Sequence, residues 1–294
     1  VFSHVTREFT TLNLLKSVFI SAFIMWLTIM STYSIVQLLR GIDPLLSWAG
    51  LALAAFSPLM LFIKAYLAKS PRTPRHPVEY SVLSGLGLAM TMAGSYRYGD
   101  AAGIIHVWAG ISVLGWLIYL RWYSVFHGRD AQLLESGEPL PDFRLESLEG
   151  NTVSSESFKA RPHLLIFYRG NWCPYCTAQI EELASAYQKL ESLGLAVVCI
   201  SSQPIEKSQA LAAKFELPLL FLRDRNNTAA QQLGIADSWG TPMGMQLLGY
   251  PSDTAMPTII LTDEKGSVVY TDQTDNYRLR PEPDIFETLL KSHT

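Results

Sequence analysis

The stretch Phe167-Tyr168-Arg169-Gly170-Asn171-Trp172-Cys173-Pro174-Tyr175-Cys176 follows an apolar run and precedes an amphipathic run that begins at Thr177. This order predicts a strand, a turn and a helix, with Cys173 at or just before the helix N-terminus. The free N–H groups and the positive dipole end of a helix favour a thiolate over a thiol at that position. Cys176, three residues on, lies within disulfide reach of Cys173 across one helical turn. Two thiols placed in this way accept and return two electrons.

The two halves of the chain differ in charge and polarity. The 294 residues are 49% hydrophobic, and the mean hydropathy is positive. Residues 1–130 carry a net charge of +5 and residues 131–294 a net charge of −8, which together give the −3 of the whole chain. A basic, apolar first half and an acidic second half predict a membrane region joined to a soluble domain. The soluble half lacks a basic stripe with interleaved aromatic residues, so we expect no nucleic-acid partner.

The three cysteines of the chain, Cys173, Cys176 and Cys199, all lie in the second half. An odd number of cysteines in a domain large enough for its own core argues against a disulfide scaffold. A structural zinc site needs four ligands, usually from two paired knuckles, and Cys199 lies inside an apolar run that predicts an inert core position. We therefore interpret Cys173 and Cys176 as a catalytic pair and expect no metal, with metal binding as the alternative.

Four uncharged, apolar runs in residues 1–127 predict membrane-spanning helices. They cover about residues 17–39, 44–63, 80–96 and 101–120, close to the 20 or so residues that cross a bilayer. The first run is too long for the apolar part of a signal peptide. The third run is the weakest because it is rich in Gly and Ser. Its small residues Gly85, Ala89 and Ala93 recur every four positions and predict a face for close helix packing.

Basic residues near the ends of these spans predict their orientation. The segments before the first span, after the second and after the fourth hold most of them: Arg7, Lys16, Lys64, Lys69, Arg72, Arg75, Arg121 and Arg129. Because basic residues stay on the cytoplasmic side, we expect four spans with both termini in the cytoplasm. The chain would then be an integral protein of a bacterial inner membrane, and its soluble half would face the cytoplasm. Loss of the third span would reverse that placement.

The predicted membrane region offers little redox chemistry of its own. His106 and His127 are 21 residues apart, or roughly 30 Å along a helix, so one haem does not bridge them. The spans contain no cysteine, which excludes a relay of electrons through the membrane by thiol exchange. We expect the spans to anchor the chain in the bilayer, and we expect no cofactor beyond a redox-active disulfide. Haem or quinone chemistry is an alternative that the sequence does not support.

Residues 128–136 form a polar linker, and residues 137–294 are predicted to form one soluble domain. Strands are expected on either side of Gly150 and at 163–168, 195–201, 217–222, 258–262 and 267–271, and helices at 178–193, 204–215, 226–233 and 283–291. This alternation predicts a mixed central sheet flanked by helices. A long loop, 235–256, is expected to cover the active site or to contact the membrane. Arg278 and Arg280 alternate along the chain and are expected to share one exposed face.

The soluble segment also carries family features. It opens with Gly-x-Pro-x-Pro-Asp-Phe-x-Leu at 137–145, continues with a turn at Gly150, and then has the dithiol stretch 167–176. In these features it resembles the thioredoxin-like superfamily, and within it the redoxin (AhpC/TSA) group related to the peroxiredoxins. Met256-Pro257-Thr258, before a strand, is similar to the cis-proline position of that superfamily. The predicted fold is therefore a thioredoxin-like α/β domain joined to a four-span α-helical membrane region that resembles no family.

The resemblance implies roles for individual residues. Cys173 matches the nucleophile, Cys176 the resolving cysteine, and Pro257 the proline that packs beside the disulfide and receives substrate. Four further residues are expected to support this platform: Arg169, Trp172, Pro174 and Thr258. Peroxiredoxins carry a Thr three residues before their cysteine, whereas Gly170 stands three residues before Cys173. Their activating Arg also has no counterpart immediately before Pro257.

These features predict an oxidoreductase. The leading hypothesis is thiol–disulfide exchange, in which Cys173 attacks a disulfide and Cys176 resolves the mixed disulfide. The partner would be a thiol or disulfide protein or a small thiol, and the bilayer would hold the chain. The alternative is a peroxiredoxin-like thiol peroxidase, in which a hydroperoxide oxidises Cys173 and Cys176 condenses with the sulfenic acid. A non-enzymatic redox sensor or membrane scaffold is a second alternative.

Overall fold

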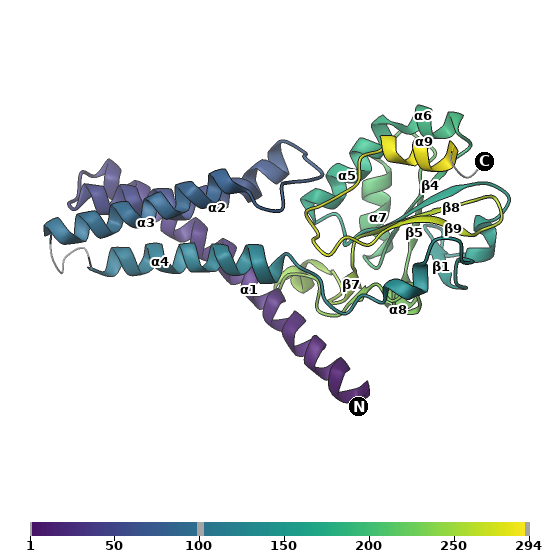
Figure 1. The fold of residues 1–294 in the computed structure, drawn as a ribbon, viewed down its shortest axis with the longest axis horizontal. Helices are drawn as coiled ribbons and strands as arrows, with labels where there is room; N and C mark the ends of the chain where they lie inside the picture. The colour runs from purple at the N-terminus through teal and green to yellow at the C-terminus, as the bar shows by residue number, and fades with distance from the viewer. Residues whose placement is uncertain (1, 99–102, 292–294) are drawn as a thin grey trace. The chain divides into compact units, whose positions relative to one another are not determined.

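The computed structural model describes residues 2–98 and 103–291. The first two residues of the expected span 101–120 and the last three of the expected domain 137–294 therefore lie outside the described residues. The chain forms two compact units. One contains the residues up to Ser17, Lys69–Arg72 and the residues from Phe126 onward, and the other contains Val18–Ala68 and Thr73–Val125. Figure 1 shows the elements of both units.

The unit that contains Val18–Ala68 and Thr73–Val125, which we call the apolar unit, is built from four helices. They are α1 (Phe2–Leu39, whose residues up to Ser17 belong to the other unit), α2 (Leu45–Leu67), α3 (Val78–Tyr98) and α4 (Gly103–Ile118), which continues into a π-helical turn, η2 (Tyr119–Tyr123). Among the described residues, three stretches are long and apolar enough to cross a membrane: Thr10–Leu39, Leu45–Leu67 and Gly103–Tyr123. The third expected span forms a helix, but its Gly and Ser residues make it less apolar than the others. By length and composition the expectation of four spans is thus reduced to three.

Helices α2 and α3 pack through small residues, although not through the predicted ones. Gly85, Ala89 and Ala93 are exposed, whereas the buried positions of α3 are Ser84, Gly87, Thr91 and Gly94. A Cβ atom added at Gly87 would overlap the backbone of Gly50 and Ala54 on α2, whereas one added at Gly85 would meet no atom within 4 Å. The buried positions are spaced by three, four and three residues, which follows the 3.6-residue helical repeat more closely than a strict spacing of four.

The soluble unit contains a seven-stranded mixed sheet, as the sequence predicts. Its strands are β1 (Arg144–Ser147), β2 (Thr152–Ser154), β3 (His163–Phe167), β4 (Ala196–Ser201), β5 (Leu220–Arg223), β8 (Thr258–Thr262) and β9 (Val268–Asp272). The spatial order is β2-β1-β5-β4-β3-β8-β9. Strands β3, β4 and β5 are parallel neighbours, and the other pairs are antiparallel. A second, two-stranded sheet pairs β6 (Ala236–Asp237) with β7 (Thr254–Ala255) and so closes the long loop at its base.

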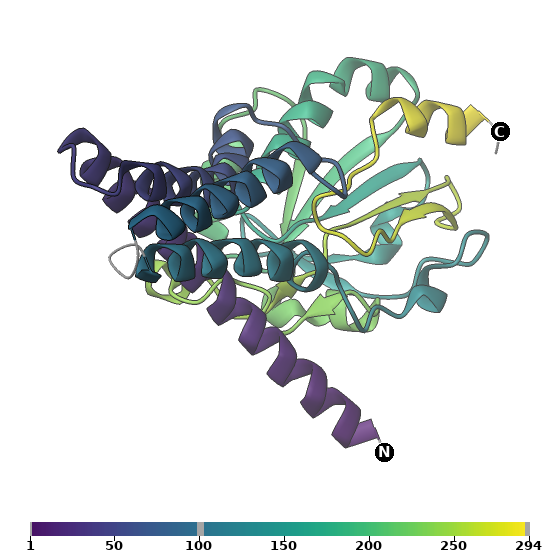
Figure 2. The same cartoon turned by 60° about the vertical axis from the view of Figure 1, so that its left-hand side comes forward.

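Helices cover both faces of the sheet (Figures 1 and 2). They are α5 (Pro174–Ser185), α6 (Tyr187–Ser192), α7 (Ile205–Ala212), α8 (Thr228–Gln232) and α9 (Asp284–Lys291), with 3₁₀ turns η3 (Ala131–Leu134), η4 (Ser155–Phe158), η5 (Arg225–Asn227) and η6 (Met245–Leu248). The single helix expected at 178–193 begins earlier, at Pro174, and is interrupted at Ala186. All five residues of β3 are buried, so this strand lies at the centre of the domain.

The main hydrophobic core lies on one face of the sheet. Leu165 and Phe167 of β3 pack there with Ala229 and Ala230 of α8, and the alternating residues Leu164 and Ile166 point to the opposite face. With apolar side chains on both faces, β3 is held rigidly, and its carboxyl end fixes the start of the loop that carries the two thiols.

We expect Gly87→Ala to destabilise the α2–α3 pair and Gly85→Ala to leave it intact. At Gly87 the new methyl group meets backbone, which cannot rotate away, and overpacking of this kind costs about 1–3 kcal/mol. At Gly85 the methyl group enters open space, and alanine favours the helix. Thermal unfolding of the purified, detergent-solubilised protein measures both effects. Equal midpoints for the two variants would contradict this account of the packing.

Candidate active site

The two thiols lie at the start of helix α5. Cys173 is the N-cap residue, with φ −91° and ψ 109°, and Pro174 occupies the first helical position. Cys176 therefore lies in the first turn, where its N–H donates to the Cys173 carbonyl oxygen at 3.1 Å. The strand–turn–helix pattern of the sequence predicts this placement. Pro at the first helical position is favourable because its missing N–H has no partner within the helix.

Both thiols are free and almost fully buried, with exposed fractions of 2% for Cys173 and 1% for Cys176. The two side chains interact, and each shifts the pKa of the other. Nη2 of Arg280 lies 3.8 Å from Cys176 Sγ. A guanidinium group remains charged inside a protein, so Cys176 has a permanent positive charge beside its sulfur.

The surroundings assign different charge states to the two thiols. Burial raises the pKa of Cys176, but the interaction with Cys173 and the charge of Arg280 outweigh burial and lower the pKa to about 6. Burial and the interaction with the Cys176 sulfur raise the pKa of Cys173 well above the usual value. The opposite directions of these pKa shifts favour a single thiolate in the pair, with Arg280 on the Cys176 side.

Arg280 was not anticipated, because the sequence led us to expect Arg278 and Arg280 on an exposed face. That expectation is wrong: Arg278 is fully buried and Arg280 is 8% exposed. Arg280 lies 104 residues after Cys176, in the segment between β9 and α9, and no local pattern links the two positions. The sequence shows only two arginines between Tyr277 and Pro281, and this pattern fits an exposed segment as well as a buried one.

Arg169 is a second buried cation near the thiols. Its guanidinium carbon lies 4.9 Å from the centre of the Trp172 ring and 5.4 Å from that of Tyr277. Nη2 donates a hydrogen bond to the Gly240 carbonyl oxygen and lies 3.9 Å from the Asp237 carboxylate. Its charge also contributes to the lowered pKa of Cys176, after that of Arg280. The expected supporting residues Arg169 and Trp172 are thus brought together, with Arg169 over the indole ring.

Pro257 and Thr258 lie at the start of β8, but the cis-proline expectation is wrong. In the part of the chain that the structure describes, the Met256–Pro257 peptide bond is trans. Two residues join β7 to β8, and X-Pro bonds favour the trans form by about 0.5–1 kcal/mol. Arg129 binds both residues, donating to Thr258 Oγ1 at 2.7 Å and to the Pro257 carbonyl oxygen at 3.3 Å.

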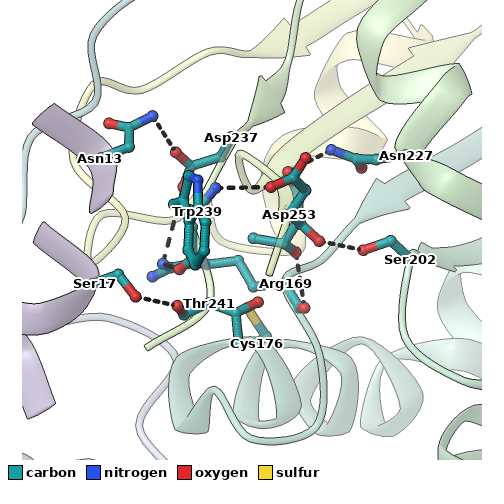
Figure 3. A network of polar contacts seen from close by, with 12 residues as sticks. Asn13, Ser17, Arg169, Cys176, Ser202, Asn227, Asp237, Trp239, Thr241 and Asp253 are labelled. Atoms are coloured by element: carbon teal, nitrogen blue, oxygen red, sulfur yellow. Dashed lines mark hydrogen bonds and ion pairs between the residues drawn. The ribbon is translucent and has the colours of Figure 1, made fainter. Parts of the chain in front are cut away.

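The long loop and the first turns of the chain complete this region (Figure 3). The loop supplies Asp237 and Gly240 to Arg169. Asn13 on α1 donates to Asp237 Oδ1 at 3.1 Å, and Ser17 Oγ donates to the Thr241 carbonyl oxygen at 2.6 Å. The sequence did not anticipate that the start of α1 would hold the loop that supports Arg169.

Cys199 lies apart from the pair, in strand β4, where it is fully buried. Burial raises the pKa of its thiol, and its backbone pairs with Phe221 of β5. This environment keeps the thiol protonated, in agreement with the inert core position that the sequence predicts.

A mixed sheet flanked by helices, with two thiols at the start of the helix after a buried central strand, defines a thioredoxin-like redoxin domain. The model of the AhpC/TSA family matches residues 136–271. Peroxiredoxin Q, chloroplastic, from Sedum lineare is 33% identical over 173 residues, which cover 58% of this chain and 81% of that protein. The chain belongs to the AhpC/TSA family, whose relatives found here are peroxiredoxins, a class of oxidoreductases.

Two further proteins show the extent of the similarity. Peroxiredoxin Q, chloroplastic, from Triticum aestivum is 33% identical over 157 residues, 53% of this chain. The chain spans 65% of the length of that relative. The crystal structure of peroxidoxin BcpB from Mycobacterium tuberculosis aligns with a TM-score of 0.45 and 20% identity, covering 55% of this chain and 99% of that one.

We expect the Cys176 thiolate to form as pH rises through about 6 and to be lost as pH falls through the same value. In Arg280→Gln, the midpoint should move up toward the ordinary cysteine value of about 8.5. Thiolate absorbance at 240 nm, taken as the difference between each protein and its Cys176→Ser form, measures the midpoint. The exposed Arg225 provides the matched control, Arg225→Gln, which should titrate like the parent. An unchanged midpoint in Arg280→Gln would rule out Arg280 as the stabilising charge.

Proposed function

We propose that this protein is a thiol peroxidase in which Cys176 attacks the hydroperoxide and Cys173 resolves the product. The observation that carries the proposal is the contact of Cys176 Sγ with the Arg280 guanidinium at 3.8 Å, together with the interaction between the two thiols. This assignment reverses the roles that the sequence led us to expect, and it is the peroxidase alternative rather than the leading hypothesis of thiol–disulfide exchange. The peroxiredoxin relatives support the choice of a peroxidase over thiol–disulfide exchange.

The family pattern is also easier to reconcile with Cys176 as the attacking residue. The resemblance calls for a hydrogen-bonding Thr three residues before the reactive cysteine. Three residues before Cys176 stands Cys173, whose thiol interacts with that of Cys176. The activating Arg that is missing before Pro257 has a counterpart in Arg280. Both family features that are absent when Cys173 is taken as the nucleophile thus have a candidate when Cys176 takes that role.

The proposed reaction uses the two thiols in sequence. The Cys176 thiolate attacks the protonated oxygen of the hydroperoxide; the S–O bond forms, the O–O bond breaks, and the proton passes to the other oxygen, which leaves as an alcohol or water. A proton from solvent then converts the sulfenate into the sulfenic acid. Arg280 stabilises the anionic sulfur before attack and the negative charge that develops on the leaving oxygen. The Cys173 sulfur then attacks the Cys176 sulfenic acid, which releases water and forms the disulfide. Two electrons pass from the dithiol to the peroxide.

The disulfide must then be reduced by a thiol donor in two exchange steps. A thiol protein or a small thiol is the proposed partner, and the cycle requires no cofactor beyond the disulfide itself. Trp172, whose ring lies over Arg169, adjoins Cys173, so its fluorescence provides a reporter of the redox state of the pair.

We expect Cys176→Ser to lower the rate of oxidation by hydrogen peroxide by at least roughly 10²-fold, the size of effect that removal of one catalytic group produces. Cys173→Ser should still be oxidised at a comparable rate, but it should accumulate sulfenic acid, because no second thiol condenses with it. Stopped-flow tryptophan fluorescence measures the rates, and dimedone trapping with mass spectrometry identifies the sulfenic acid. Cys199→Ser is the matched control and should behave like the parent.

The opposite pattern would restore thiol–disulfide exchange with Cys173 as the nucleophile. In that case Cys173→Ser would abolish turnover, Cys176→Ser would trap mixed disulfides with partner thiols, and peroxide would oxidise the parent no faster than a free thiol.

We also propose that the apolar helices anchor the chain in a bilayer, with the redoxin domain in the cytoplasm of a bacterial cell. Three helices meet the length and composition of a span. The cytoplasmic placement requires the less apolar helix α3 to cross as a fourth span, because three spans would put the domain on the other side. A cysteine placed at the exposed Ser157, in a chain whose three native cysteines are serine, reports the side of the membrane. We expect a membrane-impermeant maleimide to label it only after the cells are permeabilised. Labelling of intact cells would place the domain on the outer side.

A further inference from the structure

A polar cavity lies beside the carboxyl ends of strands β4 and β5, and the proposed reaction does not use it. Its volume is about 520 Å³, and its wall includes Ser202, Arg223, Asn227, Gln246, Tyr250 and Asp253. Cavities of roughly 300–1,000 Å³ are typical of small-molecule sites. All of these residues belong to the soluble unit.

The cavity and the dithiol open from the same edge of the sheet. Ser202 directly follows β4 and Arg223 ends β5, whereas the dithiol loop follows β3. These three strands are parallel neighbours, so their carboxyl ends lie side by side, which is where ligands bind in open α/β sheets. With strands about 4.8 Å apart, the cavity begins about 5–10 Å from the end of β3.

Hydrogen bonds join the cavity wall to the dithiol loop. Gln203, next to Ser202, accepts a hydrogen bond from the backbone N–H of Asn171 at 3.0 Å. The Asn171 side chain donates to the Lys207 carbonyl oxygen on α7 at 2.9 Å. Asn171 stands two residues before Cys173, so the cavity wall and the thiols are held in one polar framework.

Three buried polar atoms of the cavity residues have no hydrogen-bond partner in the described protein: Arg223 Nε, Gln246 Nε2 and Asn227 Oδ1. Asn227 is 2% exposed, and its Nδ2 donates to the Thr254 carbonyl oxygen at 2.7 Å (Figure 3), which fixes the orientation of Oδ1. A buried polar atom without a partner destabilises the folded protein, so these atoms favour a ligand that pairs with them. The two donors, Arg223 Nε and Gln246 Nε2, would be satisfied by a carboxylate or carbonyl group of a ligand. The acceptor, Asn227 Oδ1, would be satisfied by an amide N–H of the same ligand.

The charged side chains of the cavity also favour a ligand with a carboxylate. Arg223 forms an ion pair with Glu146 at 3.6 Å, and its Nε is the buried donor that is left for another acceptor. Asp253 supplies a carboxylate that accepts from the Trp239 N–H through one oxygen at 2.9 Å. One cation, one anion and two amides match a molecule with a carboxylate, an ammonium group and peptide bonds.

We propose that this cavity binds the reductant of the disulfide, and that the reductant is a small peptide thiol with a free carboxylate held by Arg223. This inference rests on the proposed peroxidase function, whose disulfide needs a thiol donor. An extended tripeptide is about 10 Å long, which covers the separation between the cavity and the dithiol loop. The polar ends of such a molecule occupy the cavity while its thiol reaches the disulfide.

The redox step balances with two molecules of the peptide thiol. The first thiolate attacks one sulfur of the Cys173–Cys176 disulfide; the S–S bond breaks, a mixed disulfide forms, and the released cysteine takes up a proton. A second thiolate attacks the peptide sulfur of the mixed disulfide, which frees the remaining cysteine and forms the peptide disulfide. Two electrons pass from the two thiols to the protein.

Binding is tested apart from catalysis with S-methylglutathione, a peptide that cannot react. We expect calorimetric titration to show binding to the full chain, with the affinity reduced about tenfold or more in Arg223→Gln, because this variant loses a charge-assisted hydrogen bond to the carboxylate. Arg225→Gln, two residues away and exposed, is the matched control and should bind like the parent. Gln246→Ala, in the surface turn η6, should also weaken binding.

Reduction is tested with the peroxide-oxidised protein. In Arg223→Gln, reduction by glutathione should slow about tenfold or more, while reduction by uncharged 2-mercaptoethanol and oxidation by peroxide stay unchanged. An absence of S-methylglutathione binding to the parent, or an equal loss with both thiols, would overturn the inference. Failure of the proposed function itself would appear differently, as slow oxidation by peroxide in the parent protein, with peptide binding still measurable.

Discussion

A buried thiolate is unstable unless a positive charge accompanies it, and the contact of Arg280 with Cys176 satisfies that requirement. The contact joins the first turn of α5 to a segment that follows the last strand of the sheet. Helix α5 supplies free N–H groups at its start, and the sheet holds both segments at fixed positions. The charge state of the site therefore depends on the whole domain being folded.

The burial of the site explains why two thiols three residues apart differ so strongly. In water both would titrate alike, but inside the protein a single negative charge is tolerated and the second is disfavoured by the first. Arg280 lies beside Cys176 and so favours the charge on that sulfur. Arg169 adds a more distant positive charge, and its position depends in turn on Gly240 and Asp237 in the long loop. The loop thus influences the reactive sulfur through Arg169 without contributing a thiol.

Features that depend on neighbouring residues were predicted well from the sequence. The apolar run of β3, the helix start at Cys173 and the mixed sheet all follow from short patterns. The roles of the two thiols depend on Arg280, which is distant in sequence, so no local pattern bears on them. The packing face of α3 was misjudged because a spacing of four residues drifts from the helical repeat. The cis-proline expectation failed because the Met256–Pro257 bond takes the trans form, which X-Pro bonds favour.

The exposed fractions of 1% and 2% at the two thiols have a consequence for how this protein is assayed. In the reduced protein, a reagent the size of a disulfide dye or a labelled maleimide needs open space around sulfur, whereas hydrogen peroxide is little larger than water; the thiol donor and dimedone act on the oxidised pair instead. A colorimetric thiol count on the native chain would therefore report fewer than the three cysteines of the sequence, and only denaturation would reveal the full number. Proteome-wide labelling of reactive cysteines would overlook this pair for the same reason: size, not nucleophilicity, would determine the signal.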